Sequence, residues 1–501
     1  MSFTPSKYQQ AIYTFIQDGE GNAVIDAVAG SGKSTTIVNA LKLIPETQSV
    51  LFLAFNKAIV EELRIKVGNL RNVEVKTLHS LGASSIMNQI NTTIQADKYR
   101  TWVNTGLKFG GIEPLMDLEY EELSEYKANI MKLIDLLRVN LCNSSSDMLD
   151  LVDKHGLDLI DNELDIAKKA INWGLMEMGQ IDFTDMIYFP NMKNIRMPQY
   201  DWVFIDECQD LNAAQREMFL KCVKPEGRFI AVGDPRQAIY GFAGADVKSF
   251  NILKATPNTT EFPLSVCYRC DSDIIDLAKT LVPQIEARDN APQGTVNLNA
   301  SIKDVQDGDM ILCRVTAPLA RLCMKYIGQG VKAYIKGKDI GTNLINMINK
   351  TKRTNVLDAL EVLDRELDKI AKRVSSQQKC SPAEAKHSNQ YTIYEDKIKA
   401  IEVLSEGLTQ TRQLVSRIES IFNEGNRAGI CLSTIHKAKG LEADRVFIAC
   451  PDKLYNRRAM AIDWMAEQET NLVYVAYTRA KHHLGFITDF EEKDGNEKIW
   501  E

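Results

Sequence analysis

Short runs of apolar and β-branched residues, bounded by turn residues, recur along the chain. They cover residues 22–26, 50–55, 202–206, 228–233, 446–450 and 484–487. Runs of this length are typical of strands that are buried on both faces of a parallel sheet. Between them, apolar residues at helical spacing predict helices, for example over residues 33–43 and 57–67. This alternation indicates an α/β fold with two cores and crossover helices.

Two long stretches break this rhythm, because their apolar residues recur every three or four positions and strand signals are few. The first, about residues 83–179, includes the helical run 121–141. The second, about residues 344–426, has two helix-length segments around a polar joint at residues 375–389. Each is predicted to be a helical insertion that serves either as a packing hairpin or in gripping a substrate. The predicted domains are a first core at 1–82 and 180–265 with its insertion at 83–179, and a second core at 266–343 and 427–501 with its insertion at 344–426.

The composition is that of an ordinary soluble globular protein. Its 501 residues are 45% hydrophobic and 25% charged, and a chain of this length has room for about three or four domains. The net charge of −7 argues against a protein that coats nucleic acid nonspecifically, because such binding needs clustered Lys and Arg. Any nucleic acid should therefore bind in a local groove of the protein.

The N-terminal residues lack a basic segment followed by an apolar one, and no stretch approaches the roughly 18 apolar residues of a membrane span. We therefore expect a cytoplasmic protein without membrane contact. Ten cysteines are scattered singly, and only Cys267 and Cys270 have CxxC spacing. Since no second pair completes a zinc site, we expect reduced thiols.

Residues 27–34 follow a predicted strand and open a predicted helix, which is the context of a phosphate-binding loop. Gly30 and Gly32 let the backbone curl so that its N–H groups point at phosphate oxygens. Lys33 would neutralise the β- and γ-phosphates, and the Ser34 hydroxyl would coordinate Mg²⁺. The strict pattern begins with glycine, where this chain has alanine. The predicted nucleotide-binding residues of this loop are Ala27, Gly30, Ser31, Gly32, Lys33, Ser34 and Thr35.

An apolar run at residues 203–205 ends in two adjacent carboxylates, Asp206 and Glu207. A buried strand that delivers Asp206 to the phosphates would supply an oxygen ligand for Mg²⁺. Glu207 is then placed to orient and deprotonate the attacking water, a role worth about 10²- to 10⁴-fold in rate. Residues 56–59 lack the acidic residue of a guanine-reading motif, so ATP is favoured over GTP.

With these two motifs, further segments follow in the order of the motif series of UvrD/Rep-like superfamily 1 helicases, which the chain resembles from about residue 4 to 485. The resemblance implies two RecA-like P-loop cores in tandem, each with a mainly helical insertion. It also implies movement on single-stranded DNA from 3′ to 5′. Residues 4–12 resemble the segment whose glutamine reads adenine, which is Gln9 or, alternatively, Gln10.

Several segments resemble family segments that touch nucleic acid. Residues 53–57 and 77–80 match the two that contact single-stranded DNA from the first core, and residues 182–185 fit a further short segment. The resemblance also places a histidine of residues 434–442 near a DNA phosphate. The predicted nucleic-acid-binding residues are Phe55, Asn56, Thr77, His79, Phe242 and His436.

Residues 232–245 match the third family motif, which couples ATP to DNA. Here Gln237 would sense the γ-phosphate and Phe242 would stack on a base, a contact worth roughly 1–3 kcal/mol per base. The alternative for Phe242 is a place in the core. The family often has arginine where this chain has Ala243, so contacts of that guanidinium are absent or supplied elsewhere.

The second core resembles the family in the residues that complete the nucleotide site. Tyr268 would stack on adenine, Arg269 would reach the γ-phosphate, and Glu442 would lie near the ribose. Arg479, which follows the strand-like residues 474–477, matches the arginine finger. Such fingers contribute roughly 10³- to 10⁵-fold to the rate.

These features predict an ATP- and Mg²⁺-dependent DNA helicase that moves along single strands and unwinds duplex junctions. One alternative is a translocase that strips proteins from single strands without unwinding. Another is a nucleic-acid-gated ATPase switch. RNA stays open as a track, because contacts to phosphates and base faces carry little information about the sugar. The compact size also fits a phage-encoded enzyme that acts in the host cytoplasm.

Overall fold

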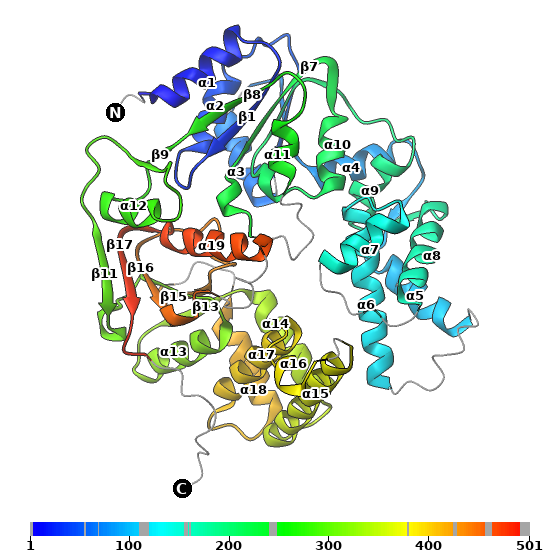
Figure 1. Ribbon diagram of the computed structural model, residues 1–501, viewed down its shortest axis with the longest axis vertical. Helices are drawn as coiled ribbons and strands as arrows, with labels where there is room; N and C mark the ends of the chain where they lie inside the picture. The colour runs from blue at the N-terminus through cyan, green and yellow to red at the C-terminus, as the bar shows by residue number, and fades with distance from the viewer. Residues whose placement is uncertain are drawn as a thin grey trace. The chain divides into compact units, whose positions relative to one another are not determined.

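The computed structural model of the protein (Figure 1) describes residues 4–54, 57–68, 70–109, 120–154, 159, 162–239, 248–377, 380–423, 428–455 and 463–490. The chain divides into two compact units, Met1–Ser265 and Val266–Glu501. Each is built on a parallel sheet with helices, so the predicted α/β class with two tandem cores is confirmed. No helix among the described residues combines the length and the apolar character that a membrane-spanning helix requires.

The first unit contains a six-stranded sheet with the order β3-β2-β6-β7-β1-β8. Its strands are β1 (Asn22–Ala27), β2 (Val50–Ala54), β3 (Val73–Thr77), β6 (Tyr200–Ile205), β7 (Val223–Gly233) and β8 (Thr259–Leu264). The helices of this core are α1 (Lys7–Asp18), α2 (Lys33–Leu41), α3 (Lys57–Val67), α4 (Leu78–Met87), α9 (Asp185–Met192), α10 (Ala213–Leu220) and α11 (Ser249–Lys254). Phe52 and Phe204 pack in one apolar cluster, whereas Leu51 and Leu53 pack in another. Both faces are buried, which explains why the run at residues 50–55 lacks polar alternation.

Between β3 and β6 lies the first helical stretch. It contains β4 (Thr93–Ile94), α5 (Lys98–Phe109), α6 (Tyr120–Val139), α7 (Ser145–Lys154), α8 (Glu163–Met176) and β5 (Gln180–Ile181). These helices share an apolar cluster that includes Ile130, Leu133 and Ile171 and extends to Phe189 of α9. Figure 1 shows them gathered beside α4 and α9. The predicted helical character of this stretch is confirmed.

The second unit contains a seven-stranded sheet with the order β11-β17-β16-β12-β15-β13-β14, and a two-stranded sheet of β9 and β10. The strands are β9 (Val266–Cys267), β10 (Glu286–Ala287), β11 (Thr295–Ala300), β12 (Met310–Cys313), β13 (Ala333–Lys336), β14 (Phe422–Asn423), β15 (Ile430–Thr434), β16 (Ala443–Ala449) and β17 (Ala480–Ile487). The helices of this core are α12 (Ser272–Lys279), α13 (Thr316–Gly328) and α19 (Asp463–Tyr477). All pairings within the two sheets are parallel.

The second helical stretch has more helices than the two predicted from its pattern. It contains α14 (Lys338–Lys350), α15 (Val356–Gln377), α16 (Pro382–Ala385), α17 (Asn389–Ser405) and α18 (Thr411–Ile421), with the short α16 inside the predicted polar joint. Leu363 and Ile401 of these helices share one apolar cluster with Ile311 of the sheet. Asp396 of α17 accepts hydrogen bonds from the backbone N–H groups of Thr316 (2.9 Å) and Ala317 (3.0 Å), at the start of α13. This stretch therefore packs directly on its core.

The strand predicted at residues 474–477 is wrong, because these residues end helix α19. Val473, Tyr474, Val475 and Ala476 are all fully buried, and a short run of buried apolar residues does not distinguish a strand from a buried helix. The strand of this region, β17, begins after the arginine of the motif. All ten cysteines of the chain are free thiols.

Candidate nucleotide site and nucleic-acid interface

The loop between β1 and α2 has the backbone that phosphate binding requires. Gly30 (φ 65°) and Gly32 (φ 77°) are in the left-handed region, which glycine adopts without steric cost. Gly32 directly precedes α2, so the first N–H groups of that helix face the loop. Ala27 is fully buried in the apolar cluster on one face of the sheet. Its methyl group therefore packs into the core, which accounts for alanine at the first motif position.

Lys33 of the phosphate loop is paired with Glu207, the predicted general base. Lys33 Nζ lies 2.8 Å from Glu207 Oε1, and both side chains are largely buried. Glu207 has a left-handed backbone (φ 54°, ψ 40°), which is uncommon outside glycine and is found at functional sites. Its other oxygen, Oε2, accepts a hydrogen bond from Gln209 Nε2 at 2.5 Å. The turn after β6 therefore directs the carboxylate at the phosphate loop.

A chain of polar contacts continues from this carboxylate to the third motif. Gln209 Oε1 accepts a hydrogen bond from the backbone N–H of Asp234 at 3.0 Å. Asp234 Oδ2 in turn accepts one from Gln237 Nε2 at 2.7 Å. A Cβ atom at Gly233 would lie 2.4 Å from Gln209 Oε1 and 2.8 Å from Cys208 Sγ, so a larger residue there would displace these side chains. The chain from Lys33 to Gln237 thus connects the phosphate loop with two motifs that begin 174 positions later at Glu207.

The electrostatics of the site favour a bound cation. Burial raises the pKa of Asp206 to about 6, and the charge of Glu207 adds to the shift. Burial also raises the pKa of Asp234. For Lys33, burial lowers the pKa, but the charges of Glu207, Asp206 and Asp234 outweigh it and the pKa is raised. Burial therefore disfavours the charged form of both carboxylates, and a cation beside Asp206 would stabilise its charged form.

A Mg²⁺ ion fits this environment when phosphates and water supply part of its coordination shell. Asp206 ends β6, and half-buried Ser34 lies in the first turn of α2. Among the described residues, no three His, Cys, Asp or Glu side chains together form a metal site. Mg²⁺ at phosphate-binding sites is typically held by one or two protein ligands together with phosphates and water. Asp206 and Ser34 suit that arrangement.

Binding of Mg²⁺ with ADP should weaken as the pH falls below about 6, the pKa of Asp206. Only the charged carboxylate binds the cation, so the affinity should fall by up to roughly tenfold per pH unit below this value and be level above it. The folding stability of the protein without nucleotide has the opposite dependence on pH. A carboxyl whose pKa is higher in the folded state costs stability as the pH rises from its ordinary value to about 6.

Calorimetric titration between about pH 5 and pH 8 would measure this dependence on either side of the pKa. Asp206→Asn is the control, since its binding should be weak and level with pH. A wild-type affinity that stays constant across this range would contradict a role of Asp206 in cation binding.

The predicted adenine reader, Gln9, is buried and its amide is engaged within the unit. Its Oε1 accepts a hydrogen bond from the Ser6 backbone N–H at 3.0 Å, and its Nε2 donates to Thr36 Oγ1 of α2 at 2.9 Å. Gln10, the alternative, is exposed. Gln9 thus lies against the helix that follows the phosphate loop. Thr35, in the same helix, is exposed, and Ser31 is buried.

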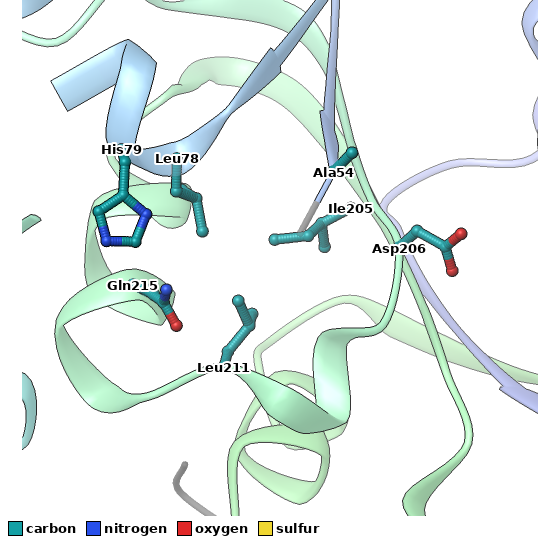
Figure 2. A pocket seen from close by; sticks show the side chains of 7 residues that line it. All are labelled: Ala54, Leu78, His79, Ile205, Asp206, Leu211 and Gln215. Atoms are coloured by element: carbon teal, nitrogen blue, oxygen red, sulfur yellow. The ribbon is translucent and has the colours of Figure 1, made fainter. Parts of the chain in front are cut away.

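Of the predicted nucleic-acid contacts in the first unit, Phe55, Asn56 and Phe242 lie outside the described residues. Thr77 caps α4, since its side chain accepts a hydrogen bond from the Ser80 backbone N–H. The His79 ring lines a small cavity between α4, β6 and α10 (Figure 2). Figure 2 shows the Asp206 carboxylate pointing away from this cavity.

That cavity is lined by Ala54, Leu78, His79, Ile205, Asp206, Leu211 and Gln215, and its volume is about 10 Å³. This is roughly the space of one water molecule. Burial lowers the pKa of His79, which favours the neutral ring. A phosphate contact by His79 would therefore be a hydrogen bond and not an ion pair.

In the second unit, Tyr268 and Arg269 follow β9. Tyr268 is 41% exposed. Arg269 Nε lies 2.7 Å from Glu442 Oε2, and Arg269 Nη1 donates to the Thr478 carbonyl at 3.1 Å. Glu442 also pairs with Lys481 at 3.2 Å. Three of the predicted motifs of this unit are therefore in direct contact.

Two family models match the chain. The model of the UvrD/REP helicase N-terminal domain matches residues 7–258, and that of the UvrD-like helicase C-terminal domain matches residues 338–491. The chain belongs to the UvrD/Rep helicase family. F-box DNA helicase 1 of Gallus gallus is 25% identical over 495 residues, which cover 92% of this chain and 46% of that protein.

Two other relatives have similar identity. F-box DNA helicase protein 1 of Schizosaccharomyces pombe is 22% identical over 516 residues, which cover 92% of this chain and 55% of that protein. ATP-dependent DNA helicase Rep of Buchnera aphidicola is 25% identical over 291 residues, which cover 52% of this chain and 42% of that protein. The chain spans about half the length of the curated relatives it matches.

Arg479, the predicted arginine finger, is held inside the second unit. Arg479 is 1% exposed, and its guanidinium donates to the carbonyls of Val475 (2.9 Å) and Leu441 (3.2 Å). Its position between α19 and β17 gives it these backbone partners. His436 is half-buried, and burial together with the charge of Arg314 lowers its pKa to about 4. Its imidazole is therefore neutral near pH 7.

The family segment at residues 182–185 joins the first core to its helical stretch through buried charges. Arg138 of α6 contacts Asp182 and Asp185, each at 2.8 Å, and Lys98 of α5 contacts Asp185 at 2.8 Å. Arg138, Lys98 and Asp185 have no exposed side-chain surface. Phe183, between the two aspartates, is exposed. Asp182 and Asp185 therefore link the first core to helices α5 and α6 of its helical stretch.

Replacing Arg138 by Met should destabilise the first unit by about 3–5 kcal/mol, because it leaves buried carboxylates without their partner. Urea-induced unfolding followed by fluorescence would measure the change. Arg365→Met is a matched control, since Arg365 is 71% exposed in a helix of the second unit. An unfolding midpoint equal to that of the wild-type protein would show that the network contributes little.

Sequence reasoning assigned no role to three residues that the geometry makes important. Gln209 and Asp234 bridge the acidic motif and the third motif, and Arg288 contacts the backbone of Tyr268. Asp234 lies inside the predicted third motif and Gln209 lies two residues after Glu207, so their positions were a usable signal. Arg288 lies in no motif, and only the pairing of β9 with β10 reveals it.

Proposed function

We propose that the protein is an ATP-dependent DNA helicase that moves along single-stranded DNA and unwinds duplex. One observation carries this proposal: a continuous chain of polar contacts links Lys33, Glu207, Gln209, Asp234 and Gln237. Such a chain would transmit the state of the nucleotide to the third motif. Membership of the UvrD/Rep family supports the choice of DNA, and the 3′ to 5′ direction is taken from that family.

The hydrolytic step follows from the pairing of Lys33 with Glu207. ATP binding would draw Lys33 from Glu207 to the β- and γ-phosphates, because phosphate charges compete for the same ammonium group. The freed Glu207 carboxylate then accepts a proton from the attacking water. Asp206 and Ser34 would hold Mg²⁺, which neutralises charge on the phosphates when bound. Gln237 would sense the γ-phosphate.

The family resemblance also assigns nucleotide contacts to residues of the second unit. Tyr268 would stack on adenine, Arg269 would contact the γ-phosphate, and Glu442 would lie near the ribose. Since Arg269 pairs with Glu442, binding of ATP would require an exchange of partners like that of Lys33. Arg479 would act as the finger and make turnover depend on both units.

The nucleic-acid contacts complete the proposed motor. Phe242 would stack on a base and His436 would lie near a phosphate. The other predicted residues would contact the single strand from the first unit; these are Phe55, Asn56, Thr77 and His79. Repeated nucleotide-dependent rearrangement of the protein while it is bound to a single strand would produce directional movement.

The test is the steady-state ATPase rate with single-stranded DNA, with single-stranded RNA and without nucleic acid. We expect strong stimulation by DNA, followed by strand separation on a forked duplex with a 3′ overhang. Stimulation without strand separation, but with displacement of a bound protein, would favour a translocase. A rate that is indifferent to nucleic acid would contradict the motor and favour an ATPase switch.

A further inference from the structure

Arg288 lies beside the Tyr268–Arg269 segment because of the strand pairing. The short strands β9 and β10 pair in parallel, with Cys267 opposite Ala287. Parallel strands that end in register deliver their next residues to the same edge of the sheet. Arg288 therefore follows β10 at the place where Tyr268 follows β9.

The Arg288 guanidinium bridges two backbone carbonyls on either side of Arg269. Its Nη1 donates to the Tyr268 carbonyl at 2.9 Å and to the Cys270 carbonyl at 3.3 Å. Its Nη2 lies 3.3 Å from Asp271 Oδ1. Arg288 thus binds the backbone of both neighbours of Arg269, and Asp271 fixes the orientation of its planar fork.

Asp271 connects this arrangement to the strand that follows Arg479. Its carboxylate is 3% exposed, and its Oδ2 lies 2.8 Å from His482 Nδ1 in β17. The Asp271 backbone N–H donates to the Lys481 carbonyl at 2.9 Å. Residues of β17 therefore fix the position of Asp271, and Asp271 in turn fixes the position of Arg288.

We propose that Arg288 is a positioning residue for nucleotide binding, held in place by Asp271 and His482. This inference rests on the proposed function, in which Tyr268 and Arg269 contact the nucleotide. Tyr268 is 41% exposed, so packing covers only part of the residue, and the backbone that Arg288 holds contributes to its placement. Arg288 itself touches no reacting atom. It acts by reducing the conformational freedom of residues 268–270 before ATP binds.

The test compares Arg288→Ala, Arg288→Lys and Tyr268→Ala, alone and combined, by ATPase kinetics and by the Kd of a fluorescent ADP analogue. We expect Arg288→Ala to raise KM and Kd roughly tenfold, with a smaller change in kcat, because it removes a charged donor shared by two carbonyls. The lysine variant should be intermediate, since an ammonium group lacks the fork. In the Tyr268→Ala background, Arg288→Ala should add less than roughly twofold to the Kd of the ADP analogue, which lacks the γ-phosphate that Arg269 would contact.

The exposed Arg365 of α15 supplies the control variant Arg365→Ala, which should behave as wild type. A KM and Kd of Arg288→Ala within roughly twofold of wild type would overturn the proposal. So would an equal increase in the Kd of the ADP analogue in both backgrounds, because Arg288 would then act independently of Tyr268. If the alanine variant fails to fold, the lysine variant provides the same comparison. The Kd needs no hydrolysis, so absence of wild-type ATPase activity would contradict the proposed function and leave this test intact.

Discussion

Replacing Glu207 by Gln should reduce the ATPase rate by roughly 10²- to 10⁴-fold, while nucleotide binding is retained. The amide is nearly the same size as the carboxylate but does not accept the proton of the attacking water. It also removes the ion pair at 2.8 Å that holds Lys33. The freed lysine is then available to the phosphates, so the affinity for ADP should stay equal or increase. Steady-state kinetics and titration with a fluorescent ADP analogue measure the two effects separately.

The matched control is Glu62→Gln, at an exposed glutamate that pairs with Lys66 on α3. It changes the net charge equally and should leave both quantities unchanged. A Glu207→Gln variant that kept more than roughly a tenth of the wild-type rate would remove Glu207 from the role of general base.

Replacing Arg479 by Ala should reduce kcat by roughly 10³- to 10⁵-fold, the range measured for arginine fingers. The structure adds a second expected effect. The guanidinium donates to the carbonyls of Val475 and Leu441, and each lost hydrogen bond from a charged group costs about 1.5–3 kcal/mol. The variant should therefore unfold at a lower temperature as well as turn over slowly.

The lysine variant of Arg479 separates these two effects. Lysine keeps the charge but not the planar fork, so stability should recover more than kcat. Thermal unfolding and the ATPase rate would be measured on the same samples. Activity lost only in proportion to the unfolded fraction would contradict a direct role of Arg479 in turnover and leave a structural role alone.

Much of the fold was predictable because buried parallel strands leave a plain signal. The six predicted runs all correspond to strands, with ends shifted by a few residues. Short or partly exposed strands were not recognised, for example β3 and β11. Their apolar content is too low to distinguish them from loops. Residues 474–477 show the opposite error, since a buried helix end produced the pattern of a strand.

The sequence alone determined the chemical groups of the candidate site. Phosphate loops, acidic strand ends and the Tyr268–Arg269 segment are local patterns, and their chemistry depends on residues that lie close together along the chain. The same local order determined the α/β class and the family to which the chain belongs.

The tertiary structure alone decided which of these groups are partners. Strand β7 lies beside β1 in the sheet, which places Gly233 opposite Asp26 although about two hundred positions separate them. The order β6-β7-β1 also brings the turn after β6 to the loop after β1, so Lys33 pairs with Glu207. In the second unit, the pairing of β9 with β10 places Arg288 beside Tyr268. Arg479 is buried against carbonyls of its own unit. Such pairings arise from strand order and register, and these are set by the packing of the whole sheet and not by the residues within any one motif.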